Sequence, residues 1–359
     1  MVVTRDDQIP LCTHVYEGNR ADSKEFPLFL DRMRRRVEEV VGEKVKDLTV
    51  VYDKGNLSKV NQTMADGGPI HYVTSLPLRQ QQELAGIPKR NYETLNAASR
   101  LSGLRVYRCK RTIWGQERTV VLLFSPTLAE GQKRGLHQHL GKRLTSLSKW
   151  KEQLAKPGSG PRSSNAGREQ AKALSTGQYI NNVLEVEYNA RKRGANRLTW
   201  SVDEGALANL QTEVFGKMIL ITDRDDWSTE EIVIGYRGQS HIERAFRQHK
   251  DPDHLAVRPQ FHWTDQKIRL HTLICTLAYT LSRLLERDAS RLTGWRGSLS
   301  NLLNELSKVR LALVLRNGKN RPKCEWVLEE RGEGDRAMRI FQALVPDRPP
   351  FVYTRTVGP

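Results

Sequence analysis

Asp53 is the first residue of the chain whose type and position could do chemistry. It follows the β-branched run Leu48-Thr49-Val50-Val51-Tyr52 and precedes Lys54-Gly55-Asn56, so the sequence predicts a buried strand that ends in a carboxylate and a turn. A carboxylate at the carboxyl end of a core strand is a frequent metal or catalytic position in α/β folds. The same residue type also caps helices and forms turns. Taken alone, Asp53 fits either role.

Glu243 is the second candidate, in a segment predicted to be helical up to Lys250. At helical spacing Glu243, Phe246 and Lys250 share one face, and we expect Phe246 to anchor that face in the core. Lys250 would then lie about 10 Å from Glu243, because a helix rises ~1.5 Å per residue. A carboxylate beside the core and a cation two turns away suit a metal ligand and a phosphate clamp. An amphipathic helix with a solvated edge of mixed charge is the alternative.

The spacing of residues around Glu243 resembles a family signature. The pattern Y-x2-R-x3-E-x6-K is the hallmark of DDE transposases from bacterial insertion sequences, in the insertion-sequence-four-like branch. In this chain it is formed by Tyr236, Gln239, Glu243 and Lys250.

Other segments resemble the same family in the same order along the chain. The run from Val51 to Asn56 resembles the strand that carries the family's second catalytic aspartate, and the run from Gly216 to Asp223 resembles the strand that leads back from its insertion. Residues 257–263 and 269–279 resemble the part that follows the catalytic helix. The resemblance covers roughly residues 1–290.

The resemblance implies an RNase H-like α/β fold: a mixed five-stranded sheet flanked by helices and interrupted by a β-rich insertion. Three carboxylates of the family hold two Mg²⁺ or Mn²⁺ ions, which promote in-line cleavage and transfer of DNA strands. Asp and Glu suit these hard cations because both supply oxygen ligands. On this mapping Asp53 and Glu243 are catalytic metal ligands. The implied DNA contacts are Tyr236, Gln239 and Lys250, with Arg244, Arg247 and Arg258 as weaker candidates.

Two departures from the family pattern affect what we expect of this chain. Gln239 stands where the signature has Arg, which replaces a charge-assisted phosphate contact by a neutral one. The family's first aspartate lies on a strand upstream of the hairpin that opens this chain, and Asp6, Asp7 and Asp22 are poor replacements because they lie in turns or before a helix. We therefore expect a truncated or mis-started transposase that lacks its first strand and is inactive by itself.

Composition supports a polyanionic partner. The 359 residues contain 58 Lys and Arg against 41 Asp and Glu, a formal charge of +17, which favours double-stranded DNA as partner. No apolar run is long enough for a membrane span, and the N-terminus has no secretory pattern. Four distant cysteines (Cys12, Cys109, Cys275, Cys324) predict reduced thiols in a cytoplasmic protein, and the resemblance adds association with a bacterial nucleoid.

Hydrophobic periodicity predicts the elements that must position these residues. We expect a hairpin within residues 2–16, a helix over 23–41, a second hairpin over 104–124, a basic helix over 128–156, a Gly/Ser loop over 157–165 and strands at 183–188 and 197–202. The predicted segments are the first part of the core (1–75), the β-rich insertion (76–212), the second part of the core with the catalytic helix (213–290) and a basic C-terminal region (291–359).

Several polar residues have a structural role as the simpler explanation. His271 lies on an apolar helix face and is expected to be a hydrogen-bonded core histidine. His137 and His139 lack a third ligand at metal spacing. Asp223 belongs to an acidic cluster with Asp225 and Asp226; without the family mapping, Asp223 would form an alternative triad with Asp53 and Glu243.

The leading hypothesis is a DDE transposase that binds terminal inverted repeats and performs DNA transposition. One rival is a catalytically dead DNA-binding remnant, or an inhibitor of an intact copy. Another is a nuclease of the same fold that cuts but does not join strands. The family suggests a homodimer, for which the sequence identifies no contact surface. The sequence also does not decide whether the basic helix contacts DNA.

Overall fold

The computed structural model describes residues 1–42, 48–68, 70–95, 101–161, 163–252, 255–314, 323–328 and 335–346. Contacts divide the chain into two compact units, each described by itself below. Unit 1 comprises Met1–Ala21, Glu25–Glu43 and Gly238–Pro359, and unit 2 comprises Asp22–Lys24 and Lys44–Arg237.

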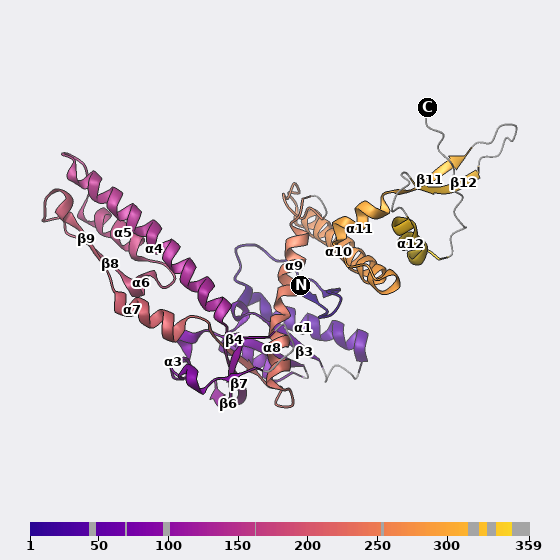
Figure 1. The fold of residues 1–359 in the computed structure, drawn as a ribbon, viewed down its shortest axis with the longest axis horizontal. Helices are drawn as coiled ribbons and strands as arrows, with labels where there is room; N and C mark the ends of the chain where they lie inside the picture. The colour runs from indigo at the N-terminus through magenta and orange to yellow at the C-terminus, as the bar shows by residue number, and fades with distance from the viewer. Residues whose placement is uncertain are drawn as a thin grey trace. The chain divides into compact units, whose positions relative to one another are not determined.

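A six-stranded mixed sheet forms the centre of unit 2, with the strand order β3-β4-β10-β7-β6-β5 (Figure 1). Strands β3 and β4 run parallel, and the other neighbours are antiparallel. The strands are β3 (Thr49–Tyr52), β4 (His71–Leu76), β5 (Glu93–Thr94), β6 (Arg105–Ile113), β7 (Gln116–Phe124) and β10 (Lys217–Thr222). The expected mixed sheet flanked by helices is confirmed, with six strands in place of five.

The central strands are buried because their sequences are apolar on both faces. Ile219, Leu220 and Ile221 of β10 are fully buried, as expected for a strand covered on both sides. On one face, Val73 and Leu220 pack with residues of helix α8 (Thr229–Arg237). On the opposite face, helix α2 (Lys59–Asp66) reaches β3 through a hydrogen bond from Tyr52 Oη to Gln62 Oε1 of 2.8 Å.

Helix α8 of unit 2 begins at a capping residue. Ser228 Oγ accepts the N–H of Glu231, and the Glu231 carboxylate accepts the N–H of Ser228, which is a capping box at the start of α8. Ser228 therefore caps the N-terminus of α8. The remaining short elements are η2 (Lys54–Asn56), η3 (Leu78–Gln80), α3 (Gln82–Ala85) and η4 (Lys89–Asn91).

Residues from 126 to 214 form an insertion with a core of its own. Its elements are α4 (Pro126–Ala155), α5 (Ser164–Ser175), α6 (Ile180–Val183), β8 (Leu184–Tyr188), η5 (Gly194–Arg197), β9 (Leu198–Val202), α7 (Glu204–Asn209) and the π-helical turn η6 (Leu210–Val214). Leucines of α4 pack with Trp150, Tyr188 and Phe215 in one cluster. Helices make up more of the insertion than its expected β-rich character suggested. The chain returns to the sheet through Gly216 (φ +80°), where a Cβ would lie 2.7 Å from Phe124.

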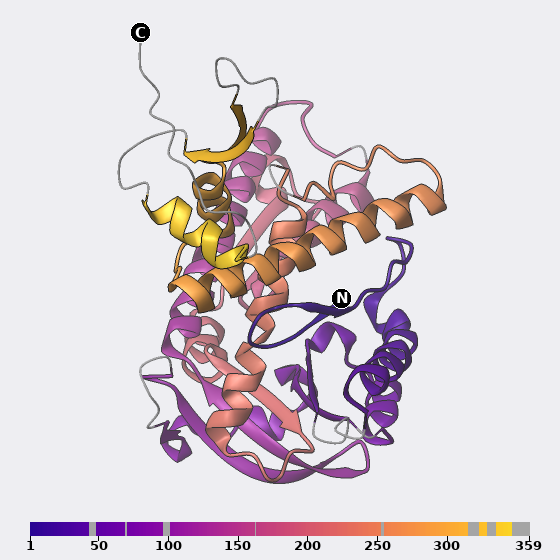
Figure 2. The ribbon, with the colours of Figure 1, turned by 90° about the vertical axis from the view of Figure 1, so that its right-hand side faces the viewer.

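Unit 1 combines the two ends of the chain. The predicted N-terminal hairpin is present as β1 (Val2–Val3) paired with β2 (Pro10–Cys12), a two-stranded sheet separate from the main one. The long helix α10 is the diagonal orange helix of Figure 2. The helices are α1 (Asp22–Val41), which begins in unit 2, then α9 (Gln239–His249), α10 (Asp265–Thr293), α11 (Leu299–Leu306) and α12 (Asp335–Leu344), with a strand pair β11 (Val309–Val314) and β12 (Lys323–Leu328).

Several features of unit 1 follow from sequence chemistry. Thr264 Oγ1 accepts the N–H of Lys267 and begins α10, and Gly294 ends it in the left-handed conformation. Trp295, Leu302 and Ile340 form a small core between α10, α11 and α12. In the part of the chain that the structure describes, no helix is long and apolar enough to cross a bilayer.

The two units do not follow the four segments expected from the sequence, whose boundaries stay predictions. Cys12, Cys109 and Cys275 are free thiols, in line with the expected reduced state.

Candidate metal and nucleic-acid site

Asp53 lies directly after β3, at the carboxyl end of the parallel pair β3–β4. Its backbone is extended (φ −78°, ψ 156°), and it precedes the 3₁₀ helix η2 without a capping hydrogen bond from its side chain. The side chain is exposed, and the structure shows no hydrogen bond or ion pair between it and another described residue. The structural role as a cap, which the sequence left open, is therefore absent, and its carboxylate oxygens are available to a ligand.

Tyr236 stands at the same end of the sheet as Asp53. Its hydroxyl is 2.8 Å from Ser75 Oγ on β4. Tyr52 is paired with Thr74, so continuing the register puts Asp53 level with Ser75 on the neighbouring strand. Strands in a sheet lie about 4.8 Å apart, and residues i and i+2 share a face, so Asp53 lies on the face that Val51 and Val73 present to α8. Two residues of the family mapping thus meet at one strand end within unit 2.

Ser75 is a residue that the sequence reasoning missed. It is 3% exposed and polar, one position before the end of β4, and it holds the Tyr236 hydroxyl. The sequence signal that could have identified Ser75 is a polar residue near the end of an otherwise apolar strand, next after the strand that ends in Asp53.

Asp223 lies at the opposite end of the parallel pair, which contradicts the alternative triad with Asp53. Its Oδ1 accepts the N–H of Tyr72 at 2.9 Å, and its Oδ2 is 2.9 Å from His71 Nδ1. By register Asp223 is level with Tyr72, about 10 Å along the strands from the level of Asp53. Asp223 therefore fastens the start of β4, the strand-end role that the family mapping gave it.

The other members of the acidic cluster are also engaged within the protein. Asp225 accepts hydrogen bonds from Lys110 Nζ (2.7 Å) and Thr119 Oγ1 (2.5 Å), and these bonds lower the pKa of its carboxyl. Asp226 Oδ2 is 3.2 Å from Arg224 Nη1. Both side chains have partners that explain them without a metal.

Glu243 lies in α9 of unit 1, and its surroundings differ from the expectation. Phe246, predicted to anchor the helix in the core, is 44% exposed, whereas Ala245 and His249 are buried. The buried face of α9 is therefore centred on Ala245 and His249, about one residue away from the predicted face of Glu243 and Phe246. Glu243 itself is exposed and makes no hydrogen bond or ion pair with another described residue.

The expected DNA-contacting residues on and after α9 are mostly free to contact a ligand. Lys250, Arg244, Arg247 and Arg258 are exposed, and the structure shows no ion pair between their side chains and other described residues. Gln239 differs, because its Nε2 is buried and has no hydrogen-bond partner among the described residues. A buried unsatisfied amide favours a contact that the described protein atoms do not supply.

Buried polar groups also surround the far side of α9 within unit 1. His241 Nδ1 is 2.9 Å from Gln8 Nε2, and burial lowers the pKa of this histidine. The rings of His249 and Tyr279 lie 4.9 Å apart, and burial lowers the pKa of His249. His271 Nε2 is 3.3 Å from the carbonyl oxygen of Ala256, which agrees with its predicted structural role.

The donor chemistry fits the implied divalent ion, although the described residues show no assembled metal cluster. Asp53 and Glu243 supply the oxygen ligands that Mg²⁺ and Mn²⁺ prefer. Among the described residues no group of three His, Cys, Asp or Glu side chains is arranged to hold a metal. Asp53 belongs to unit 2 and Glu243 to unit 1, and each is described in its own unit.

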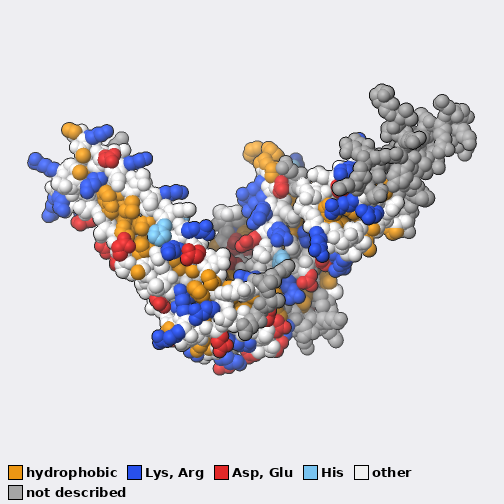
Figure 3. All heavy atoms as spheres, viewed as in Figure 1, with side chains coloured by type: hydrophobic (Ala, Val, Ile, Leu, Met, Phe, Trp, Pro, Cys, Tyr) orange, Lys and Arg blue, Asp and Glu red, His pale blue; other side chains and the backbone are white. Residues whose placement is uncertain are grey.

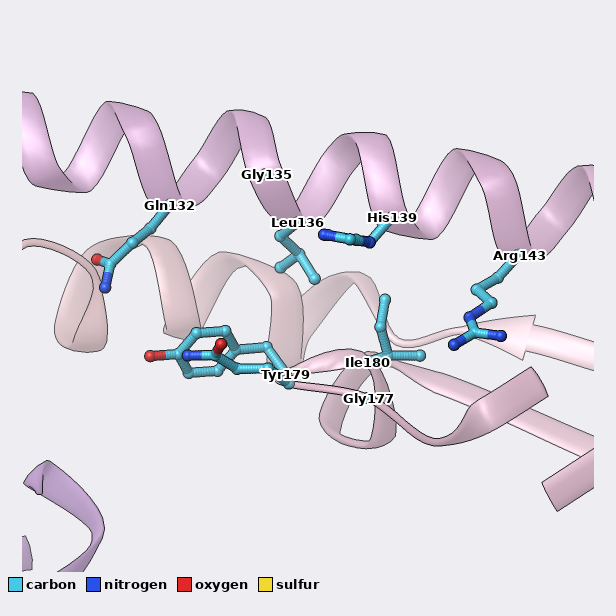
Figure 4. Close-up of a pocket in the computed structure, with 9 residues that line it drawn as sticks. Gln132, Gly135, Leu136, His139, Arg143, Gly177, Tyr179 and Ile180 are labelled. Atoms are coloured by element: carbon cyan, nitrogen blue, oxygen red, sulfur yellow. The ribbon is translucent and has the colours of Figure 1, made fainter. Parts of the chain in front are cut away.

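A cavity of about 450 Å³ lies between α4 and the loop before α6, far in sequence from these residues (Figure 4). Gln132, His139 and Arg143 of α4 face Tyr179 and Ile180 across it. Arg143 Nη2 donates to the carbonyl oxygen of Thr176 at 3.3 Å, so the guanidinium helps hold the loop. No pattern in the sequence indicates this cavity.

The sheet and its strand-end carboxylate define a mixed α/β protein with an acidic site at the end of a parallel strand pair. The family model for the transposase DDE domain matches residues 1–281, and the chain belongs to this family. A comparison with curated proteins finds no match.

Proposed function

We propose that this chain is a DNA transposase of the insertion-sequence-four-like branch, which binds terminal inverted repeats and catalyses metal-dependent strand cleavage and transfer. The truncated, inactive chain expected from the missing first aspartate is the rival to this proposal. The observation that carries the proposal is the position of Asp53. Its exposed carboxylate has no partner among the described residues and lies level with Ser75, which holds the signature residue Tyr236.

In this proposal the chain's own residues bind the metal ions, orient the DNA and neutralise its phosphate charge. Asp53 and Glu243 are metal ligands, and Mg²⁺ or Mn²⁺ bound there would supply charge stabilisation and an activated oxygen nucleophile at the scissile phosphate. Tyr236 is held by Ser75, so its hydroxyl oxygen has a fixed position from which to meet a DNA phosphate. Lys250, with Arg244, Arg247 and Arg258 as further contacts, neutralises backbone charge.

Glu243→Gln tests the catalytic part of the proposal. We expect this variant to lose Mg²⁺-dependent cleavage of a duplex that carries the element's ends, and to keep its affinity for that duplex. The exposed side chain of Glu243 has no partner among the described residues, so the substitution should not disturb folding. Loss of DNA binding together with cleavage would show that Glu243 is structural.

The same experiment decides between the proposal and its rivals. A wild-type chain that binds the duplex but never cuts it would support a DNA-binding remnant. Cleavage of DNA without terminal repeats, and without joined products, would support a nuclease. In every case the affinity should fall as salt rises, because Lys and Arg displace phosphate counterions. An affinity that does not change with salt would contradict DNA as the partner.

A further inference from the structure

Helix α4 of the insertion carries more cations than its packing uses. Two of them have partners inside the insertion: Arg143 holds the carbonyl of Thr176, and Lys151 Nζ lies 5.1 Å from the ring centre of Trp200. Of the others, Arg134, Lys142 and Lys149 are exposed, and Figure 3 shows Lys and Arg side chains distributed over the end of the insertion that α4, α5, β8 and β9 form.

Three lysines form a line along the outer face of α4, which we call the lysine stripe: Lys142 and Lys149 within the helix and Lys156 at its C-cap. They repeat every seven residues, which is two helical turns, so they share a face at a spacing of about 10 Å. Each follows two residues after a buried leucine (Leu140, Leu147, Leu154). At ~100° per residue this places the lysines opposite the buried face. All three are exposed.

Acidic side chains do not neutralise the stripe. Glu130 and Glu152 are the acidic residues of α4, and neither makes an ion pair with a described cation. Glu152 is three residues after Lys149 and four before Lys156, yet no ion pair joins it to either lysine in the part of the chain that the structure describes. Apart from Glu152, the neighbours of the stripe include the small or polar, uncharged residues Thr145, Ser146 and Gln153, and all three are exposed.

Helix α1 also has a charged, solvent-exposed face, but it differs from the lysine stripe in that its cations are paired within the helix. Its three consecutive arginines are paired with acids of the same helix: Arg34 and Arg35 with Asp31, Arg34 also with Glu38, and Arg36 with Glu39. Such pairs within a helix add a few tenths of a kcal/mol each and need no external partner. Among the described residues, the lysines of the stripe make no such pairs, so their charge is available to a ligand.

We infer that the lysine stripe of α4 binds the phosphate backbone of duplex DNA. The inference rests on the proposed function and extends it to a surface of the insertion outside the catalytic signature. One DNA strand carries a charge every ~3.4 Å of helix axis, so where α4 lies parallel to the duplex axis about three phosphates of one strand fall within the axial distance between successive lysines. Lysine side chains are long and flexible enough to meet phosphates over that distance without base-specific contacts.

The test measures the salt dependence of binding to a fluorescein-labelled DNA duplex of arbitrary sequence by fluorescence anisotropy. We expect the variant K142A/K149A/K156A to bind tens of times more weakly near physiological salt. The slope of log affinity against log salt should become shallower by about two to three, because each lost phosphate contact contributes about 0.9 to it. Alanine is the best helix former, so the helix should stay intact; K142Q/K149Q/K156Q is a second neutral variant in case the first does not fold.

Two control variants make the result specific to the stripe. K142R/K149R/K156R keeps the charge and should keep both the affinity and the slope. R34A/R35A/R36A removes the same net charge from α1, where the arginines are already paired, and should change the slope by less than one.

The possible outcomes distinguish failure of this inference from failure of the proposed function. A wild-type slope in the alanine variant, or an equal change in the α1 variant, would overturn the inference while DNA binding by the chain still stands. A wild-type protein that does not bind DNA at any salt concentration would overturn both. Loss of slope only in the neutral stripe variants supports the inference.

Discussion

At the scale of single residues, the acidic side chains of unit 2 fall into two groups. Asp223, Asp225 and Asp226 each have hydrogen-bond partners in the protein, whereas Asp53 has none among the described residues. Satisfying a carboxylate stabilises the folded protein, and leaving one exposed and unpaired contributes nothing to folding. Asp53 is therefore the residue of this group that is expected to serve function and not stability, and its substitution tests this directly.

Asp53→Ala and Asp223→Ala should have opposite effects. We expect Asp53→Ala to leave the free energy of unfolding within about 0.5 kcal/mol of wild type and to abolish metal-dependent cleavage. Asp223→Ala should cost about 1–3 kcal/mol, because it leaves the N–H of Tyr72 without its acceptor, and the folded variant should still cleave. Urea unfolding and the cleavage assay together check both, and a large stability loss in Asp53→Ala would show a structural role.

A buried ion pair should make unit 2 sensitive to acid. Arg118 donates to both carboxylate oxygens of Asp66 (2.5 and 2.6 Å) and to the hydroxyl oxygen of Tyr72. Burial acts to raise the pKa of Asp66, but the hydrogen bonds from Arg118 and Gln62 outweigh it, and the pKa of Asp66 lies below its ordinary value.

The stabilisation from a lowered pKa is complete above the unfolded-state value and is lost as pH falls through the folded-state value. We therefore expect the free energy of unfolding to drop below about pH 4 in the wild type. Asp66→Asn should cost about 3 kcal/mol at neutral pH, because Arg118 loses its counter-charge, and should flatten that pH dependence. Urea titrations between neutral pH and pH 3 measure both. An equal pH dependence in the variant would contradict the assignment to Asp66.

At the scale of elements, hydrophobic periodicity and turn residues predicted the hairpins and helices that local interactions form. The hairpins β1–β2 and β6–β7, the strands β8 and β9 and the basic helix α4 are present near their expected residues. The antiparallel insertion of β10 between β4 and β7 was not predicted, because pairing between strands some 100 residues apart leaves no local pattern.

The candidate site was predicted in part for the same reason. The types and order of Asp53, Tyr236 and Glu243 are visible in the sequence, whereas the bond between Tyr236 and Ser75 depends on packing between α8 and β4. The exposure of Phe246 was wrongly predicted, because Phe246 is only about 100° from Ala245 and about 60° from His249 on the helix. Periodicity alone therefore favoured the larger side chain.

Two glycines of the insertion should respond in opposite ways to the same substitution. A Cβ on Gly167 in α5 would lie 2.2 Å from the ring of Tyr188, whereas one on Gly141 in α4 would meet nothing within 4 Å. Gly167→Ala should therefore destabilise the insertion by at least about 1–3 kcal/mol. Gly141→Ala should stabilise it by roughly 0.5–1 kcal/mol, because alanine loses less backbone entropy in a helix. Thermal unfolding of the full chain checks both, and a neutral Gly167→Ala would show that α5 moves freely away from β8.

At the scale of the whole molecule, the described residues of unit 2 include two separate apolar cores. One joins the sheet to α8 and includes Val73 and Leu220, and the other lies wholly within the insertion between residues 129 and 215. Hydrogen exchange should then show that Gly167→Ala loses amide protection in α4, α5, β8 and β9 while β4, β7 and β10 keep theirs. Equal loss in both regions would mean that the two cores unfold as one.

The separate core of the insertion affects how the sequence of such a protein can change during evolution. A segment that satisfies its own packing joins the sheet at two points in sequence, Ser125 after β7 and Gly216 before β10, which are themselves linked by a backbone hydrogen bond of 2.9 Å. Mutation can lengthen, shorten or recharge everything between those points without disturbing the strand end that carries Asp53. Related chains can therefore differ in the length and charge of the insertion while keeping the same strand end with Asp53.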